Sequence, residues 1–465
     1  MTSETVDGPV AAAPSAPADA QPRVGERLGY GLGDLASNLT WTTITSYLLF
    51  FYTDVALIGA ATAGTILFVA RALDAIADPA VGLLLDRTQT RFGRARPYLM
   101  FGAPVLAVLT VLTFTTPAPG GGTGSIVWAY ASLILVGLVY SLVNIPYGAL
   151  MPMMTRSSDV RMRLSGWRFA CASIGLVVVS GLTTPLVGVF GGGDQRHGFL
   201  VVVSIFAGVG LLLFWVVAGT AKERVPFTPA AQRRSLGTSL RTLASNTPWV
   251  AVFVSSLFMF ARLGVLTGGA VYYALSVMGN PGAIPVILLG FSVSALLGSI
   301  VTPWVLRRTG HRRGVIGGLL LSVPVHLLLV PATGNLALFT ALFFVSGIVG
   351  GFGFVAAPAL VSDTVEYQEH RTGERNEGLL YAGYSFATKV GTAIGGALLA
   401  FGLAVIGYRP GAADPAVTTG LTWLYVGLPI VLALLQVAAL AFYRLERDLP
   451  TVVAANEARR AGEPA

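Results

Sequence analysis

The sequence predicts an all-α membrane protein with twelve membrane-spanning helices in two similar six-helix halves. Three observations predict this fold class: the composition, the lengths of the apolar segments and the distribution of positive charge. Of the 465 residues, 54% are hydrophobic and 11% are charged, whereas soluble chains carry roughly 25% charged residues. The mean hydropathy is +0.72, so most of the chain has to lie in lipid. The 56 glycines suit close helix contacts there.

Twelve apolar segments reach the length of about 20 residues that a membrane-spanning helix needs. The first six are expected at 28–57, 60–85, 97–117, 126–154, 165–190 and 197–220. The other six are expected at 247–275, 283–306, 314–332, 336–361, 376–407 and 417–443. This layout is typical of a major-facilitator transporter, which is built from repeats with the binding site between the halves.

Polar segments predict the domain organisation. Residues 1–24, rich in Ala, Pro and Asp, are expected to form a disordered cytoplasmic tail. An N-terminal six-helix bundle at 25–220 and a C-terminal bundle at 247–445 are joined by a central cytoplasmic loop, "AKERVPFTPAAQRRSLGTSLRTLASN", at 221–246. Residues 446–465 are expected to form a second cytoplasmic tail.

The positive charges of the loops predict the orientation in the membrane. The Lys and Arg residues outside the expected helices lie on the side of the N-terminus, except Arg196 and Arg409. By the positive-inside rule, both termini are cytoplasmic, and we expect a multi-pass protein of the cytoplasmic (inner) membrane. The net charge of +8 is mainly this topology signal. Charges scattered over separate short loops do not predict nucleic-acid binding.

Several ionisable residues fall inside or near the expected helices, where each costs about 2.5–3.5 kcal/mol on insertion scales. The residues within helices are Arg71, Arg168, Arg262, Lys389, Asp34, Asp74 and Asp78. Asp74 and Asp78 are four residues apart and share one helix face. Two carboxylates in a low-dielectric cavity need a nearby positive charge, which sodium or a proton would supply. The alternative is a structural network in which Arg71 neutralises one aspartate.

Long motifs in the chain closely resemble the glycoside–pentoside–hexuronide:cation symporters, the melibiose-carrier family of the major facilitator superfamily. The motifs are "LGYGLGDLASN", "YLLFFYTDV", "DAIADPAVGLLLDRTQTRFGRARP", "YSLVNIPYGALMP", "GWRFACASIG" and "SDTVEYQEHRTGERNEGLLYAGYSFATKVGTAIGG". The resemblance covers residues 25 to 443. It implies cation-coupled uptake of a glycoside by alternating access.

The resemblance also implies a cation site. Asp74 and Asp78 would hold the coupling cation, assisted by the hydroxyl of Ser141 and by Asn144. Many relatives have Asn in the position of Ala77. Sodium takes several oxygen ligands and Ala supplies none from its side chain, so a proton is slightly favoured, with sodium left open.

For the substrate, the resemblance implies a site on helices 1, 4 and 5. Asn38 and Asn144 occupy the positions of two sugar-binding aspartates, Arg168 matches a substrate-binding arginine, and Tyr140 is a ring-stacking wall. Gly148 replaces a frequent Trp, so a galactoside is not expected.

Arg262, midway along helix 7, suggests an anionic substrate such as an acidic glycoside, because a guanidinium can bind a carboxylate through two hydrogen bonds. Alternatively, Arg262 pairs with an aspartate or caps a carbonyl.

Coupling and gating are expected to use further charges. Lys389 matches a family lysine near the helix 2 aspartates, and would occupy the place of the cation in the empty state; a static salt bridge is the alternative. Arg71 is expected to assist coupling. Two loop clusters would form salt bridges that close a cytoplasmic gate between rocking halves. They comprise Asp86, Arg87, Arg94 and Arg96 in one half, and Asp363, Glu366, Arg371 and Arg375 in the other.

Other functions are weighed against symport. A proton-coupled exporter of a secondary metabolite, a lysolipid carrier and a non-transporting membrane sensor remain alternatives, since function can change on a fixed fold. The His residues are scattered without metal-ligand spacing, so no enzyme activity, cofactor or resident metal is expected beyond a possible sodium ion. We expect a protein that functions as a monomer and whose partners are a small molecule and the lipid bilayer.

Overall fold

The computed structural model describes residues 22–117, 120–155, 158–224, 243–373, 377–411 and 414–461. The helices of the first half are α1 (Val24–Phe50) with the π-helical turn η1 (Phe51–Val55), α2 (Ala60–Arg87), α3 (Arg96–Thr113), α4 (Thr123–Met154), α5 (Ser158–Gly191) and α6 (Gln195–Thr220).

The second half repeats this pattern with more interruptions. Its helices are α8 (Thr247–Tyr272) with the π-helical turn η2 (Tyr273–Val277), α9 (Ala283–Thr309), α10 (His311–Leu327), α11 (Leu329–Ala332), α12 (Leu336–Gly350), α13 (Phe352–Thr372), α14 (Glu377–Val405), α15 (Pro415–Thr422), the π-helical turn η3 (Trp423–Gly427) and α16 (Leu428–Ala441). The short turn η4 (Leu445–Arg447) leads to α17 (Leu449–Ala461).

The described helices make the twelve predicted crossings, and most ends lie within four residues of those expected. The fifth crossing begins seven residues before its predicted start, at Ser158, and the tenth runs eleven residues past its predicted end, to Thr372. Nine helical stretches in the described residues are long and apolar enough to cross a membrane by length and composition alone. The other three crossings begin with α1, α2 and α10. α1 and α2 carry polar and charged residues, and α10 has only 17 residues.

Several crossings contain irregular turns. α12 ends at Gly350 and α13 begins at Phe352, so the tenth crossing is broken in its middle. The π-helical turns η1 and η2 end the first helix of each half. Inside a membrane, such breaks need other groups to satisfy the freed backbone atoms.

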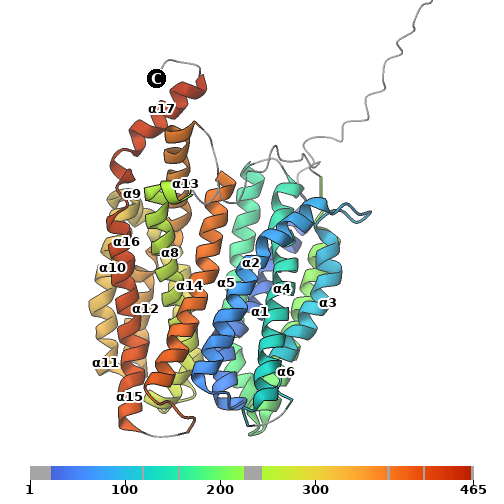
Figure 1. The fold of residues 1–465 in the computed structure, drawn as a ribbon, viewed down its shortest axis with the longest axis vertical. Helices are drawn as coiled ribbons and strands as arrows, with labels where there is room; N and C mark the ends of the chain where they lie inside the picture. The colour runs from blue at the N-terminus through green and yellow to red at the C-terminus, as the bar shows by residue number, and fades with distance from the viewer. Residues whose placement is uncertain are drawn as a thin grey trace, which may run out of the picture.

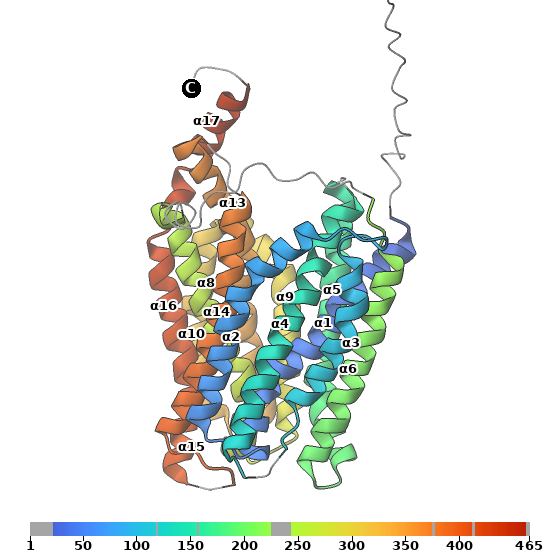
Figure 2. The same cartoon turned by 45° about the vertical axis from the view of Figure 1, so that its right-hand side comes forward.

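The two six-helix halves pack side by side, as Figures 1 and 2 show. α1 packs on α5 and α6 in the first half, and α8 packs on α14 and α16 in the second; across the interface, α2 meets α14 and α5 meets α9. Glycines permit the closest approach. A methyl group added at Gly395 of α14 would overlap the carbonyl oxygen of Ala261 on α8.

The molecule has two distinct ends. α1 begins, and α17 lies, at the upper end in Figure 1, which we call the terminus-bearing face. The other end, the opposite face, contains η1 and η2 and a buried aromatic cluster. In this cluster Phe51 lies 5.4 Å from Phe114 and 5.7 Å from Phe199 between ring centres. The predicted tail after residue 446 contains helix α17, which packs on α13.

Candidate functional site

The two aspartates of α2 meet a lysine from the other half of the molecule. Lys389 on α14 places its ammonium 2.6 Å from Asp78 Oδ2 and 3.2 Å from Asp74 Oδ2. Ser141 Oγ on α4 lies 2.6 Å from Asp74 Oδ1 and 2.8 Å from Asp78 Oδ1. Asp74 is 2% exposed, so these partners, and not bulk water, stabilise its charge. We call the four side chains the acid–lysine site.

The donors of the acid–lysine site divide between the two carboxylates. A hydroxyl has one hydrogen, so Ser141 can donate to only one aspartate at a time, and its shorter contact is to Asp74. Lys389 Nζ also donates to Asp78 Oδ1 at 2.7 Å and to Ser141 Oγ at 3.2 Å. The ammonium therefore lies among the same oxygens that would coordinate a cation.

Arg71, one turn before Asp74, lies against an aromatic pair. Its guanidinium carbon is 3.4 Å from the ring centre of Trp41 on α1, which is a cation–π contact. Trp41 stacks on Tyr140, with ring centres 4.5 Å apart and planes at 20°. Arg71 is 7% exposed and lines a void between the halves that Thr45 also lines. Tyr140, predicted to stack on a sugar ring, thus stacks on Trp41 in this structure.

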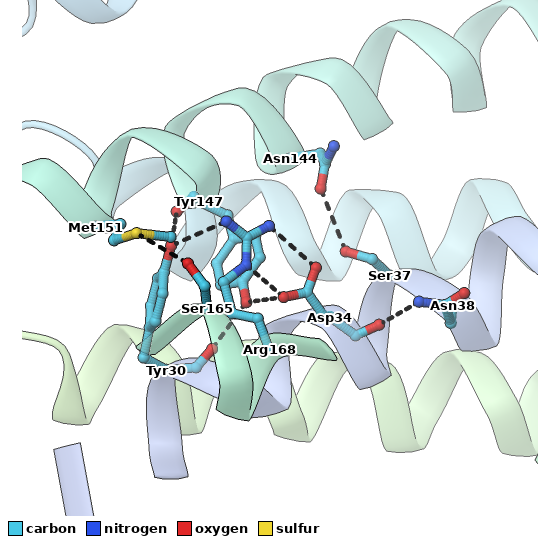
Figure 3. Close-up of polar contacts among 9 residues, drawn as sticks. All are labelled: Tyr30, Asp34, Ser37, Asn38, Asn144, Tyr147, Met151, Ser165 and Arg168. Carbon is cyan, nitrogen blue, oxygen red and sulfur yellow. Dashed lines mark hydrogen bonds and ion pairs between the residues drawn. The ribbon is translucent and has the colours of Figure 1, made fainter. Parts of the chain in front are cut away.

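A second charged cluster joins α1, α4 and α5 (Figure 3). Arg168 Nε lies 2.5 Å from Asp34 Oδ2, and Arg168 Nη2 donates to Asp34 Oδ1 at 3.1 Å. Tyr147 donates to Asp34 Oδ2 at 2.8 Å, and its ring centre lies 4.9 Å from the guanidinium carbon. Arg168 Nη1 donates to the hydroxyl of Tyr30 at 3.4 Å. The arginine predicted to bind substrate is therefore held by Asp34.

The two asparagines predicted to bind the sugar lie near this cluster (Figure 3). Asn38 donates to the backbone carbonyl of Asp34 at 2.8 Å, and its Oδ1 accepts from Thr42 at 3.1 Å. Asn144 Oδ1 accepts from Ser37 at 3.4 Å. This bond leads from α4 to α1, so the structure associates Asn144 with the Asp34 cluster and not with the acid–lysine site.

The charges described so far balance one another. Lys389 binds the acid pair of α2, Arg71 lies beside that pair, and Arg168 is paired with Asp34. With all groups ionised, three cations face three carboxylates. Of the four cations predicted within the helices, Arg262 is the one that remains outside this balance.

Arg262 lies inside the second half. Its Nη2 donates to the carbonyl of Gly350, at the break between α12 and α13. The cavity beside it is lined by residues of α8, α9, α10, α12, α13 and α16. This contact is the carbonyl-capping role expected as the alternative. The placement gives no support to a shared substrate site with Arg168 on α5.

The first loop cluster predicted to act as a latch bonds within its own half. Glu223, after α6, accepts from the backbone N–H of Arg94 at 2.8 Å and of Arg96 at 3.4 Å. Arg96 Nε donates to a carbonyl of α6 at 2.6 Å. Arg87 is exposed at the end of α2, and the side chain of Asp86 lies outside the described residues.

The second loop cluster also bonds within its own half. Asp363 accepts from Tyr443 at 3.1 Å, and Glu366 accepts from Asn456 of α17 at 3.0 Å. Arg371 donates to a backbone carbonyl before α8. Arg375 lies outside the described residues. Each hydrogen bond named here for the two loop clusters therefore joins residues of one half.

Besides the contacts of Lys389, further hydrogen bonds that cross between the halves lie near the opposite face. The hydroxyls of Thr53 and Tyr272 are 2.6 Å apart, and Tyr408 donates to Asp54 Oδ1 at 2.8 Å. Thr53 also donates to Asp54 Oδ2 at 2.6 Å. We call these four residues the opposite-face seal. With this seal formed, the molecule is closed on the opposite face.

Sequence reasoning missed the roles of Trp41, Asp34 and the opposite-face seal. Asp34 carried a signal, because a carboxylate inside a helix needs a partner. The sequence could not tell which of several cations supplies that partner. There was no comparable signal in the sequence for Trp41 and Tyr408, since aromatic residues are common throughout membrane helices.

Comparisons with known proteins identify similar chains. A family model described as "MFS/sugar transport protein" matches residues 29–447. The isoprimeverose transporter of Lactiplantibacillus pentosus is 36% identical over 95% of this chain and 92% of its own. A putative 2,3-dihydroxypropane-1-sulfonate exporter of Salmonella typhimurium is 34% identical over 94% and 96% of the two chains. The glucuronide carrier protein homolog of Escherichia coli is 32% identical over 90% and 92%.

Solved structures share the fold at low sequence identity. A bacterial homolog of the human lysosomal transporter Spinster, in an inward-facing and unoccupied conformation, aligns with a TM-score of 0.69 at 12% identity, covering 92% of this chain and 97% of that one. The nucleoside transporter NupG aligns with a TM-score of 0.64 at 14% identity, covering 91% and 100%. These likenesses confirm the predicted fold class.

Proposed function

Because the chain belongs to the MFS/sugar transport protein family, we propose that it is a cation-coupled symporter that carries a glycoside across the inner membrane by alternating access. The observation that carries the proposal is the Lys389 ammonium bound between Asp74 and Asp78. Both termini lie in the cytoplasm, so the terminus-bearing face is the inner face. The sealed opposite face makes this conformation inward-facing.

The acid–lysine site supplies the coupling step. Lys389 comes from the second half, while Asp74, Asp78 and Ser141 come from the first, so their contacts join the halves. A proton on Asp78, or a sodium ion among the carboxylates, releases the ammonium. The released charge is costly in a low-dielectric interface, so the ammonium competes with the coupling cation for the acid pair.

The paired charges favour a neutral glycoside. Arg168, which would attract an acidic group of the substrate, already binds Asp34 through both Nε and Nη2. An acidic substrate would have to displace a carboxylate of the protein before it could bind there. The stacked rings of Trp41 and Tyr140 and the amides of Asn38 and Asn144 offer apolar faces and neutral hydrogen-bonding groups, which suit sugar rings and hydroxyls.

The test is counterflow and active uptake in proteoliposomes. The neutral disaccharide isoprimeverose is compared with a glucuronide and with 2,3-dihydroxypropane-1-sulfonate, with and without sodium and across pH. We expect uptake of the neutral sugar, driven by an inward cation gradient. Uptake that continues without sodium and follows an imposed pH gradient assigns the proton. Transport of the sulfonate alone, against an inward cation gradient, would instead establish an exporter of anions.

A further inference from the structure

A second buried polar site lies inside the C-terminal six helices. Arg262 on α8 and His326 on α10 line the same cavity of about 30 Å³, and they are 8% and 6% exposed. Ser322 and Gly350 add polar groups to the lining, and Phe343 belongs to its apolar part. No transport step proposed above uses this site.

The charge of Arg262 has no counter-charge there. Its contact with Gly350 is to a carbonyl oxygen, which accepts a hydrogen bond but carries no net charge. The ion pairs among the described residues join other partners, and none includes Arg262. An unpaired charge buried in a protein inside a membrane is strongly destabilising. The site is therefore electrostatically incomplete.

His326 offers an unused hydrogen-bonding atom in the same cavity. Its Nδ1 lies 3.1 Å from Ser346 Oγ, while Nε2 is buried without a hydrogen-bond partner in the part of the chain that the structure describes. When Ser346 donates to Nδ1, the ring hydrogen is on Nε2, and it can be donated into the cavity. Two donor groups, one of them charged, then face the same small space.

We propose that this cavity binds a small monovalent inorganic anion, a halide such as chloride, between the Arg262 guanidinium and His326 Nε2–H. The size of the cavity suits this ligand, because about 30 Å³ holds roughly one or two water-sized particles. A water molecule would satisfy Nε2 but leave the guanidinium charge unpaired. The anion joins α8 and α10 beside the break between α12 and α13.

The experiment measures thermal unfolding of the purified full-length protein in sodium chloride and in sodium gluconate at equal ionic strength. Gluconate is a much larger organic anion than chloride, and the sodium concentration is constant. We expect chloride to raise the unfolding midpoint with a saturable concentration dependence, because a ligand that binds only the folded state stabilises it. Equal midpoints in both salts would mean that the cavity holds water only, and the proposal fails.

Variants locate the effect. His326→Leu removes Nε2 and keeps Arg262 on the Gly350 carbonyl; we expect it to raise the chloride dissociation constant at least tenfold. Arg308→Gln is the matched control, because Arg308 is exposed on Trp304 at the surface, and it should respond to chloride like the unmodified protein. Loss of the response in Arg308→Gln but not in His326→Leu overturns the proposal. So does stabilisation by sodium glucuronate without stabilisation by chloride, which would make the site a substrate site.

Discussion

At the scale of single residues, the role of a charged side chain depends on the group with which it is paired. Arg168 and Arg262 are both buried or half-buried arginines of membrane helices, but one is paired with a carboxylate and the other with a carbonyl. The first is neutralised and leaves its cluster suited to a neutral sugar. The second retains its charge. From the sequence, Arg168 was expected to bind the substrate and Arg262 to indicate an anionic one, because a sequence shows residue types and not their neighbours.

Asp34→Asn should change the charge preference of the substrate site. The substitution keeps the size of the side chain but leaves Arg168 without its counter-charge. We expect the affinity for a neutral glycoside to fall at least tenfold and binding of a glucuronide to increase, measured as competition in counterflow. Asp448→Asn, at an exposed position, is the control. Unchanged affinities for both sugars in Asp34→Asn would show that Arg168 does not face the substrate.

Lys389→Gln should separate exchange from accumulation. Without the ammonium, the empty acid pair no longer has an internal partner that competes with the cation. We expect counterflow to persist while accumulation against a sugar gradient falls at least tenfold. Lys222→Gln is the matched control, because Lys222 is an exposed loop residue. Normal accumulation by Lys389→Gln would reduce the contact to a static salt bridge.

At the scale of elements, the predicted helices follow from a single physical requirement. A chain segment in lipid must satisfy its own backbone and span the apolar layer, so length and composition predict nearly every crossing and most of the ends. The break at Gly350 and the π-helical turns were not predictable. They depend on what lies across from the freed backbone groups, such as Arg262 at the Gly350 carbonyl. Helix α17 was also not predicted, because it lacks an apolar segment long enough to indicate a membrane-spanning helix.

The crossing of α8 and α14 offers a test of close packing. Gly395→Ala adds a methyl group against the Ala261 carbonyl, whereas Gly396→Ala adds one whose nearest neighbour is Leu67 Cδ1 at 3.9 Å. Overpacking of this kind costs about 1–3 kcal/mol. We expect Gly395→Ala to lower the thermal midpoint and Gly396→Ala to leave it nearly unchanged. Equal midpoints for the two variants would contradict the described contact of α8 with α14.

At the scale of the whole molecule, the candidate site was predictable in part. Asp74, Asp78, Ser141 and Lys389 were expected together and are found together. Helical spacing predicts only that the two aspartates lie together. The expectation that Ser141 and Lys389 join them came from the family resemblance. The latch between the loop clusters was predicted for the outward-open state, because a sequence encodes every state of the cycle and one structure displays one of them. Its salt bridges remain a prediction for the outward-facing state.

Tyr408→Phe should favour opening of the opposite-face seal. The change removes one hydrogen bond to Asp54, with a net contribution of about 1 kcal/mol, which corresponds to roughly a fivefold shift in population. The reporter is Thr45→Cys in a Cys171→Ser background, since Thr45 lines the void between the halves. We expect faster labelling by a membrane-impermeant maleimide added on the opposite face. Tyr130→Phe serves as the control. Equal labelling rates in Tyr408→Phe and Tyr130→Phe would show that the seal does not restrict access.

The π-helical turns η1 and η2 have a consequence for the history of the chain. Each is five residues long and directly follows the first helix of its half, yet the two read FYTDV and YALSV. The halves of this fold are repeats related by an axis along the membrane normal, so the two widened turns occupy equivalent places. One ancestral segment, duplicated once, accounts for both. The backbone has kept the mark of that duplication where the amino acids have diverged.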